Sequence, residues 1–231
     1  MKKKKYSETE CKEKFNSAIK NPQTLYQQDF VNWKGKATNG RYYADIISEL
    51  LLKNIEKLNE IPMIDRARGY LSQHRNNLQR VNGSNRREER KVIGFNGKNI
   101  GELGKVIDYQ IPLRDNQRDR AGKIDFISVN DNYAYLTEFK YESEESLLKA
   151  VLEIYTYAKI INLERLINEL EKKLKIKDIK IQTAILFDVN SSFMYEQYKN
   201  LTDMPFLKKL IEKLQVEVYI LTEIAINAFD L

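Results

Sequence analysis

The sequence predicts an α/β fold in which helices flank a central mixed sheet. Three patterns lead to this prediction. Short β-rich runs follow one another in the middle of the chain, an amphipathic helical pattern comes directly after them, and the dense apolar run over 179–187 is typical of a buried central strand. A chain of 231 residues can bury one substantial core plus an elaboration, and a hydrophobic fraction of 42% fits a globular protein.

The first part of the chain, over residues 1–85, is predicted to be a helical N-terminal region. Apolar residues at helical spacing predict three helices, over 8–19, 42–58 and 65–81. Turn-forming residues at 82–85 mark the boundary with the second part. These helices either simply extend the core or form a surface for specificity or dimerisation.

The second part, over residues 86–231, is predicted to hold the catalytic fold. Its expected order is helix, three strands, helix, strand, helix, strand. The ranges are a helix over 86–93, strands over 105–113, 124–129 and 133–141, one long helix or two over 144–174, a strand over 179–187, a helix over 206–214 and a strand over 216–221.

Two acids and a lysine converge on the hairpin formed by the second and third strands. With the turn at 130–132, Asp125 lies opposite Glu138. Side chains alternate along a strand, so Glu138 and Lys140 share one face and Phe139 points to the other. Two carboxylates can hold a divalent metal, and an ammonium beside them can orient water. Two carboxylates and an ammonium in this arrangement suit metal-assisted phosphodiester hydrolysis.

The spacing Asp125-x12-Glu138-x-Lys140 resembles the PD-(D/E)XK nuclease superfamily, although Ile124 stands where many members have proline. The predicted element order over about 86–231 resembles the αβββαβ core of this restriction-endonuclease-like fold, here with an N-terminal helical extension. The resemblance implies a metal-dependent nuclease. Asp125, Glu138 and the carbonyl of Phe139 would bind Mg²⁺ (or Mn²⁺), because oxygen ligands favour these ions. Lys140 would position water or stabilise charge on the phosphorane.

A further acid in this superfamily commonly comes from the helix before the first strand. Glu88 and Glu89 are the candidates, and Glu89 is favoured because apolar residues stand three and four positions after it. Glu102 and Asp108 are weaker alternatives. The predicted catalytic set is therefore Asp125, Glu138, Lys140 and Glu89.

The charge balance favours a polyanionic partner. The net charge is +6, and basic residues gather before the proposed site. The residues expected to contact nucleic acid are Arg86, Arg87, Arg90, Lys91, Arg118, Arg120 and Lys123. DNA is the expected partner, and cutting both strands of a duplex would favour a homodimer.

Several protein classes are disfavoured by composition. One cysteine and one histidine argue against zinc sites and histidine-dependent nucleases. No apolar run approaches a membrane span, and no signal core follows the basic start, so we expect a cytoplasmic protein without membrane contact. Two alternatives stay open: a non-catalytic nucleic-acid-binding module on the same fold, and an α+β protein-interaction domain.

Overall fold

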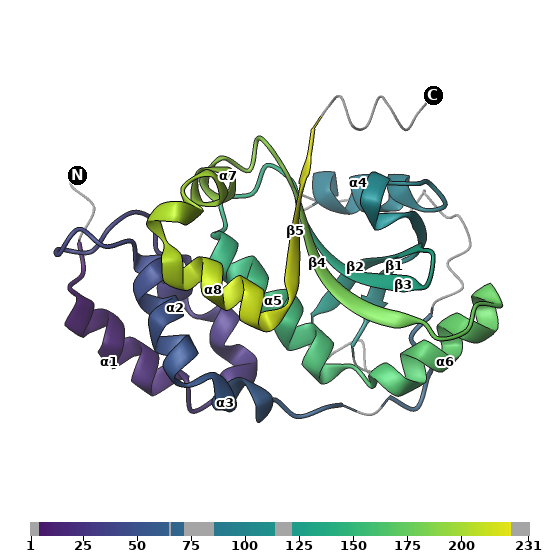
Figure 1. Cartoon of the computed structure of the whole chain (residues 1–231), viewed down its shortest axis with the longest axis horizontal. Coiled ribbons are helices and arrows are strands. Elements are labelled where there is room, and N and C mark those ends of the chain that lie inside the picture. The colour runs from purple at the N-terminus through teal and green to yellow at the C-terminus, as the bar shows by residue number, and fades with distance from the viewer. Residues whose placement is uncertain (1–4, 65, 72–85, 114–121, 223–231) are drawn as a thin grey trace.

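Five strands form one mixed sheet at the centre of the computed structural model, which describes residues 5–64, 66–71, 86–113 and 122–222. The strand order is β1-β2-β3-β4-β5. The first three strands run antiparallel to one another, whereas β3, β4 and β5 run parallel. Helices cover both faces of the sheet (Figure 1). The predicted α/β class, with a mixed sheet flanked by helices, is confirmed.

The strands begin and end within one or two residues of their predicted bounds. They are β1 Lys105–Pro112, β2 Lys123–Asn130, β3 Tyr133–Lys140, β4 Lys180–Asp188 and β5 Val216–Leu221. In the β2–β3 hairpin, Val129 pairs with Ala134 and Phe126 pairs with Thr137. Continuing this register by one pair places Asp125 opposite Glu138, as the sequence predicts.

The helices of the second part include one that the sequence did not reveal. They are α4 Arg86–Phe95, α5 Leu147–Ile160, α6 Leu163–Leu174, α7 Ser192–Lys199 and α8 Pro205–Leu214. The long helical pattern divides into α5 and α6 because Ile161 is extended and Asn162 caps the second helix, its Oδ1 accepting from Arg165 N at 3.1 Å. The short α7 was not predicted. Within the described ranges, no helix is long and apolar enough to cross a bilayer.

Side-chain alternation in β3 separates two layers. Phe139 packs on the α4 side, where its ring centroid lies 5.3 Å from that of Phe95. Glu138 and Lys140 face the opposite side, where Lys140 meets Glu153 of α5. The predicted alternation is therefore confirmed, and it directs the polar side chains into the layer beneath α5.

The N-terminal region consists of short helices. They are α1 Glu8–Ala18, η1 Pro22–Gln27, η2 Asp29–Asn32, α2 Tyr43–Lys53 and α3 Ile55–Asn59. The helix predicted over 42–58 is interrupted at Asn54, whose φ of −122° and ψ of 29° are not helical. Residues 66–71 are not helical either, so that part of the helix predicted over 65–81 is wrong, and 72–81 lie outside the described residues.

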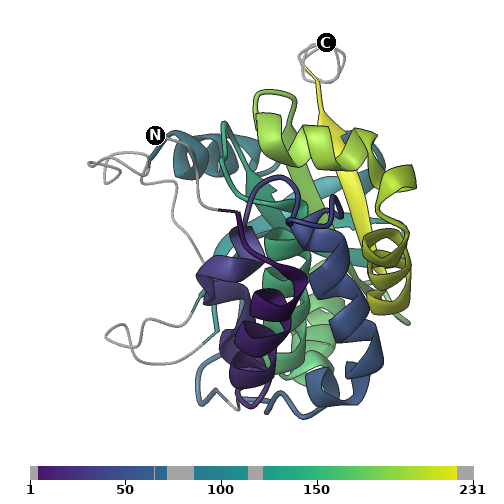
Figure 2. The same cartoon turned by 90° about the vertical axis from the view of Figure 1, so that its left-hand side faces the viewer.

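These helices extend the core of the sheet layer instead of enclosing a separate one. Phe15 and Ile47 belong to the same buried cluster as Ile154 of α5. Asp45 of α2 also accepts hydrogen bonds from the first turn of α8, from Phe206 N at 2.8 Å and from Leu207 N at 3.4 Å. The two views show α2 beside α8 (Figures 1 and 2). Asp45 thus joins α2 to the N-terminus of α8, which is far away in sequence.

Replacing Asp45 with alanine should destabilise the chain, because two N–H groups of α8 and the guanidinium of Arg41, 3.2 Å away, lose their acceptor. Loss of a capping acceptor costs about 1–2 kcal/mol. Urea unfolding followed by circular dichroism measures the change. Asp203→Ala, on the exposed η5 turn Leu201–Asp203, is the matched control and should cost less than about 0.5 kcal/mol. Equal effects of the two substitutions would contradict this role.

Candidate functional site

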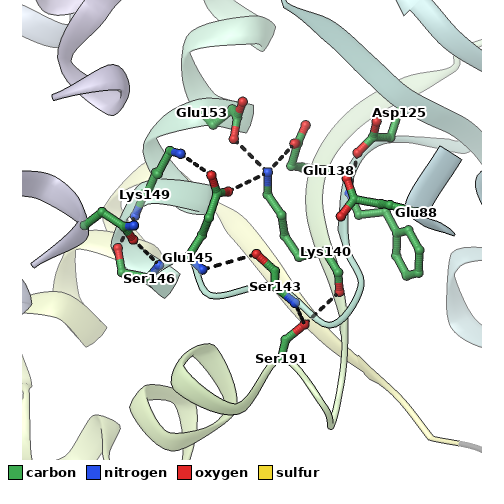
Figure 3. Close-up of polar contacts among 12 residues, drawn as sticks. Glu88, Asp125, Glu138, Lys140, Ser143, Glu145, Ser146, Lys149, Glu153 and Ser191 are labelled. Carbon is green, nitrogen blue, oxygen red and sulfur yellow. Dashed lines mark hydrogen bonds and ion pairs between the residues drawn. The ribbon is translucent and has the colours of Figure 1, made fainter. Parts of the chain in front are cut away.

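The ammonium of Lys140 lies among three carboxylates (Figure 3). Its Nζ is 2.8 Å from Glu138 Oε1, 2.8 Å from Glu145 Oε2 and 3.0 Å from Glu153 Oε2. Only 9% of the Lys140 side chain is exposed. Burial alone would lower the pKa of Lys140, but the carboxylates, Glu138 foremost, raise it well above its ordinary value. The lysine therefore stays charged at neutral pH and can donate hydrogen bonds but not accept a proton.

Asp125 lies at the start of β2 and is held by two donors. Its Oδ2 accepts from Phe139 N at 2.8 Å, and its Oδ1 accepts from Gln110 Nε2 at 3.2 Å. Burial and, to a smaller extent, the Glu88 carboxylate raise the pKa of Asp125 to about 7, against the opposing effects of the Lys140 ammonium and the Phe139 N–H. Asp125 is thus poised to carry a proton near neutral pH unless another cation approaches.

Glu138 has one oxygen that is paired and one that is not. Its Oε1 meets Lys140, whereas Oε2 is buried without a hydrogen-bond partner. Burial raises the pKa of Glu138 well above its ordinary value, and the nearby Asp125 and Glu153 carboxylates raise it further. A buried oxygen without a partner needs a physical explanation, and a bound ion is one.

Of the two candidate acids on α4, Glu88 contacts the backbone next to Lys140. Glu88 Oε2 accepts from Tyr141 N at 3.1 Å, and burial raises the pKa of Glu88. Val92 and Phe95, four and seven residues after Glu88, are buried, so Glu88 lies on the face of α4 that packs on the sheet. Ile93, four residues after Glu89, is only partly buried. A catalytic role for Glu89 stays a prediction.

The two weaker acid candidates lie elsewhere. Glu102 is exposed in η4 (Gly101–Leu103). Asp108 is buried in β1, where its Oδ2 is 4.0 Å from Lys173 Nζ of α6. Neither is among the carboxylates that surround Lys140.

Gln110 reaches Asp125 because β1 is irregular. The β1–β2 register shifts between Val106 and Asp108, and Gln110 adopts a left-handed φ of 51°. A bulge re-aims a strand, and a left-handed conformation is costly for a residue with a Cβ. Gln110 is not among the residues that the sequence predicts, since a glutamine inside a strand carries no signal of its own.

The loop after β3 is fixed by Asp188, the last residue of β4, and by Ser191, which follows that strand. Asp188 Oδ1 accepts from Glu142 N at 2.8 Å and lies 2.7 Å from Ser191 Oγ. Ser191 Oγ accepts from Ser143 N at 3.0 Å and lies 3.1 Å from the Lys140 carbonyl oxygen. This network holds the backbone on both sides of the turn and so places Glu145 beside the Lys140 ammonium. Glu145 is not among the site residues that the sequence predicts.

Helix α5 supplies Glu153 from a well-capped start. Ser146 Oγ accepts from Lys149 N at 3.1 Å and donates to the Val31 carbonyl at 2.9 Å. Further along, Tyr157 donates its hydroxyl to Glu153 Oε1 at 2.8 Å. A Cβ on Gly122 would come within 2.0 Å of that hydroxyl oxygen, so only glycine permits this approach of the chain to α5.

Several predicted nucleic-acid contacts border the site on α4. Arg87 pairs with Glu142 at 2.9 Å, the Lys91 ammonium lies 4.2 Å from the Tyr141 ring centroid, and Arg90 is exposed. Lys123 is exposed at the start of β2. The remaining predicted contacts, the side chain of Arg86 together with Arg118 and Arg120, lie outside the described residues.

A metal ion would find only oxygen ligands at this site. Among the described residues, no three or more His, Cys, Asp or Glu side chains are arranged to hold a metal by themselves. The acids instead surround Lys140. Mg²⁺ is commonly bound through one or two carboxylates plus water and substrate phosphate, so the Asp125–Glu138 pair still fits it. The carbonyl of Phe139 as a further ligand stays a prediction.

Replacing Asp125 with asparagine should stabilise the metal-free protein above neutral pH. The folded protein holds the pKa of Asp125 at about 7 against an ordinary value of 3.8, so folding favours the protonated carboxyl. The resulting penalty is absent below about pH 4, grows as pH rises, and is complete above about pH 7, where it reaches at most about 4 kcal/mol. Asparagine removes the charge and keeps an acceptor for Phe139 N.

Urea unfolding in EDTA, at mildly acidic and at mildly alkaline pH, measures this effect. The advantage of Asp125→Asn over the unaltered chain should widen with rising pH. An advantage that is constant or shrinks with rising pH would show that Asp125 is not a buried carboxylate with a raised pKa.

No family model, curated protein or solved structure matches this chain.

Proposed function

We propose that the chain is a metal-dependent nuclease that hydrolyses phosphodiester bonds in DNA. The observation that carries this proposal is the excess of buried carboxylates around one lysine. Lys140 is paired with three glutamates, and Asp125 and Glu88 add further acids beside them. Such an excess costs free energy unless protons or cations neutralise it.

Asp125 and Glu138 are the residues that would hold Mg²⁺ or Mn²⁺. The unpartnered Oε2 of Glu138 and the raised pKa values of both acids fit a site that gains stability from a cation. Both acids would give up their protons when the cation binds. A bound divalent ion lowers the pKa of its water and neutralises phosphate charge.

Lys140 would act as a fixed donor of positive charge. The carboxylates around it raise the pKa of Lys140 in the metal-free protein and keep it charged, so its proposed contribution is to orient a water or to stabilise charge on phosphoryl oxygens. The three glutamates hold the ammonium in one place, which limits the reorganisation needed during reaction. The Asp188–Ser191 contacts fix the backbone from which it extends.

Nucleic acid as the substrate is supported by the position of the basic residues. Arg87, Arg90 and Lys91 stand on the same helix as Glu88, which contacts the backbone next to Lys140. Phosphate contacts of this kind position a nucleic acid without reading its sequence. Cutting both strands of a duplex would need two such sites, and a homodimer would supply them.

Incubation of the purified chain with DNA in Mg²⁺ or Mn²⁺ should produce cleavage that EDTA abolishes. Asp125→Asn and Lys140→Gln should each lower kcat/KM at least about a hundredfold, because the first removes a charged metal ligand and the second removes a positive charge that stabilises the transition state. Gel electrophoresis of end-labelled single-stranded DNA, duplex DNA and RNA measures the rates and identifies the preferred substrate.

Lys208→Gln, the same substitution at an exposed position of α8, is the control and should retain full activity. Circular dichroism verifies that each variant is folded. Cleavage that persists in EDTA, or that survives in Asp125→Asn, would contradict the proposal. Binding of DNA without cleavage of any substrate would favour a non-catalytic module on this fold.

A further inference from the structure

Glu145 lies between two ammonium groups. Its Oε2 is 2.8 Å from Lys140 Nζ, and its Oε1 contacts Lys149 Nζ on the first turn of α5. Figure 3 shows the carboxylate between the two lysines. The exposed side-chain fractions are 27% for Glu145, 22% for Lys149 and 9% for Lys140. Glu145 therefore covers a nearly buried cation and is itself half-buried.

The position that Glu145 occupies suits a phosphate. A carboxylate bridging two lysines presents two oxygens and one negative charge, as the non-bridging oxygens of a phosphodiester do. Lysine binds phosphate as a point charge, so it accepts either group without a particular orientation. The ammonium groups keep the pKa of Glu145 below its ordinary value although burial acts in the opposite direction, so the carboxylate is charged when a substrate arrives.

We infer that Lys140 and Lys149 form a binding position for a backbone phosphate of the nucleic acid, and that Glu145 holds this position until the substrate displaces it. The inference rests on the proposed function. Lys149 would contact the substrate. The Glu145 carboxylate would compete with the phosphate for the two ammonium groups. Glu145 is the most exposed of the three carboxylates on Lys140, so its displacement disturbs the buried Glu138 and Glu153 pairs least.

The test uses Glu145→Gln and the binding of a short fluorescein-labelled DNA duplex, measured by anisotropy in EDTA at low ionic strength. Glutamine keeps the shape of the side chain and removes the competing charge, so affinity should rise by about threefold or more. Glu144→Gln is the matched control. It makes the same change of net charge one residue away, on a side chain that is 75% exposed and paired with Lys34, and it should alter affinity clearly less.

A second pair of variants locates the effect at Lys149. Lys149→Ala should weaken binding and lower the slope of log affinity against log salt by about one. In the Lys149→Ala background, Glu145→Gln should give a smaller gain, because one of the two cations that receive the phosphate is gone. Thermal unfolding confirms that all variants are folded.

The inference is overturned by equal gains in Glu145→Gln and Glu144→Gln, by a full gain in the absence of Lys149, or by no DNA binding in any variant. Because binding is measured in EDTA, this result is separate from cleavage. Cleavage without the predicted binding pattern removes the inference and leaves the nuclease proposal intact. The binding pattern without cleavage removes the nuclease proposal and retains the phosphate position.

Discussion

The contact on which the rest of the site depends is the one between the Lys140 ammonium and its three glutamates. Burying an ion of either sign without a partner costs free energy. Removing one partner of a buried ion pair is strongly destabilising, because the other charge is left buried and unpaired. Here three carboxylates lie 2.8–3.0 Å from one ammonium. The charge of the lysine is therefore fully paired, whereas the three acids together keep an excess of negative charge. Burial, with a further contribution from the remaining negative charge, raises the pKa of Asp125 and Glu138, and one Glu138 oxygen has no hydrogen-bond partner. The same imbalance is the observation on which the proposed cation site rests.

The fold holds this imbalance in place by joining segments that are distant in sequence. β3 brings Glu138 and Lys140, α5 brings Glu153, and the loop between them brings Glu145. Asp188 at the end of β4 and Ser191 just after it fix that loop. The Val31 carbonyl of the N-terminal region accepts a hydrogen bond from the hydroxyl of Ser146 at the start of α5. The N-terminal helices therefore support the helix that carries part of the site, which explains why they share its hydrophobic core.

Patterns of alternation and helical spacing were enough to predict the sheet, most of the helices and the meeting of Asp125, Glu138 and Lys140, because these features depend on local periodicity and one hairpin register. The rest depends on contacts that local patterns do not record. Gln110 reaches Asp125 only through a bulge and a left-handed residue. Glu145 reaches Lys140 through a loop that is held by another segment. The position of Glu88 beside the site depends on the rotation of α4 about its axis, which the burial of Phe95 and the hydrogen bond from Tyr141 N to Glu88 show.

The most direct test of this account is a calorimetric titration of Mn²⁺ into the chain at mildly alkaline pH, without nucleic acid. Glu138→Gln removes the unpartnered carboxylate oxygen, and Glu144→Gln removes an equal charge from the exposed loop. We expect the unaltered chain and Glu144→Gln to bind Mn²⁺ with release of protons, and we expect Glu138→Gln not to bind it. Equal binding by all three proteins, or no binding by the unaltered chain, would contradict the claim that the carboxylates around Lys140 form a cation site.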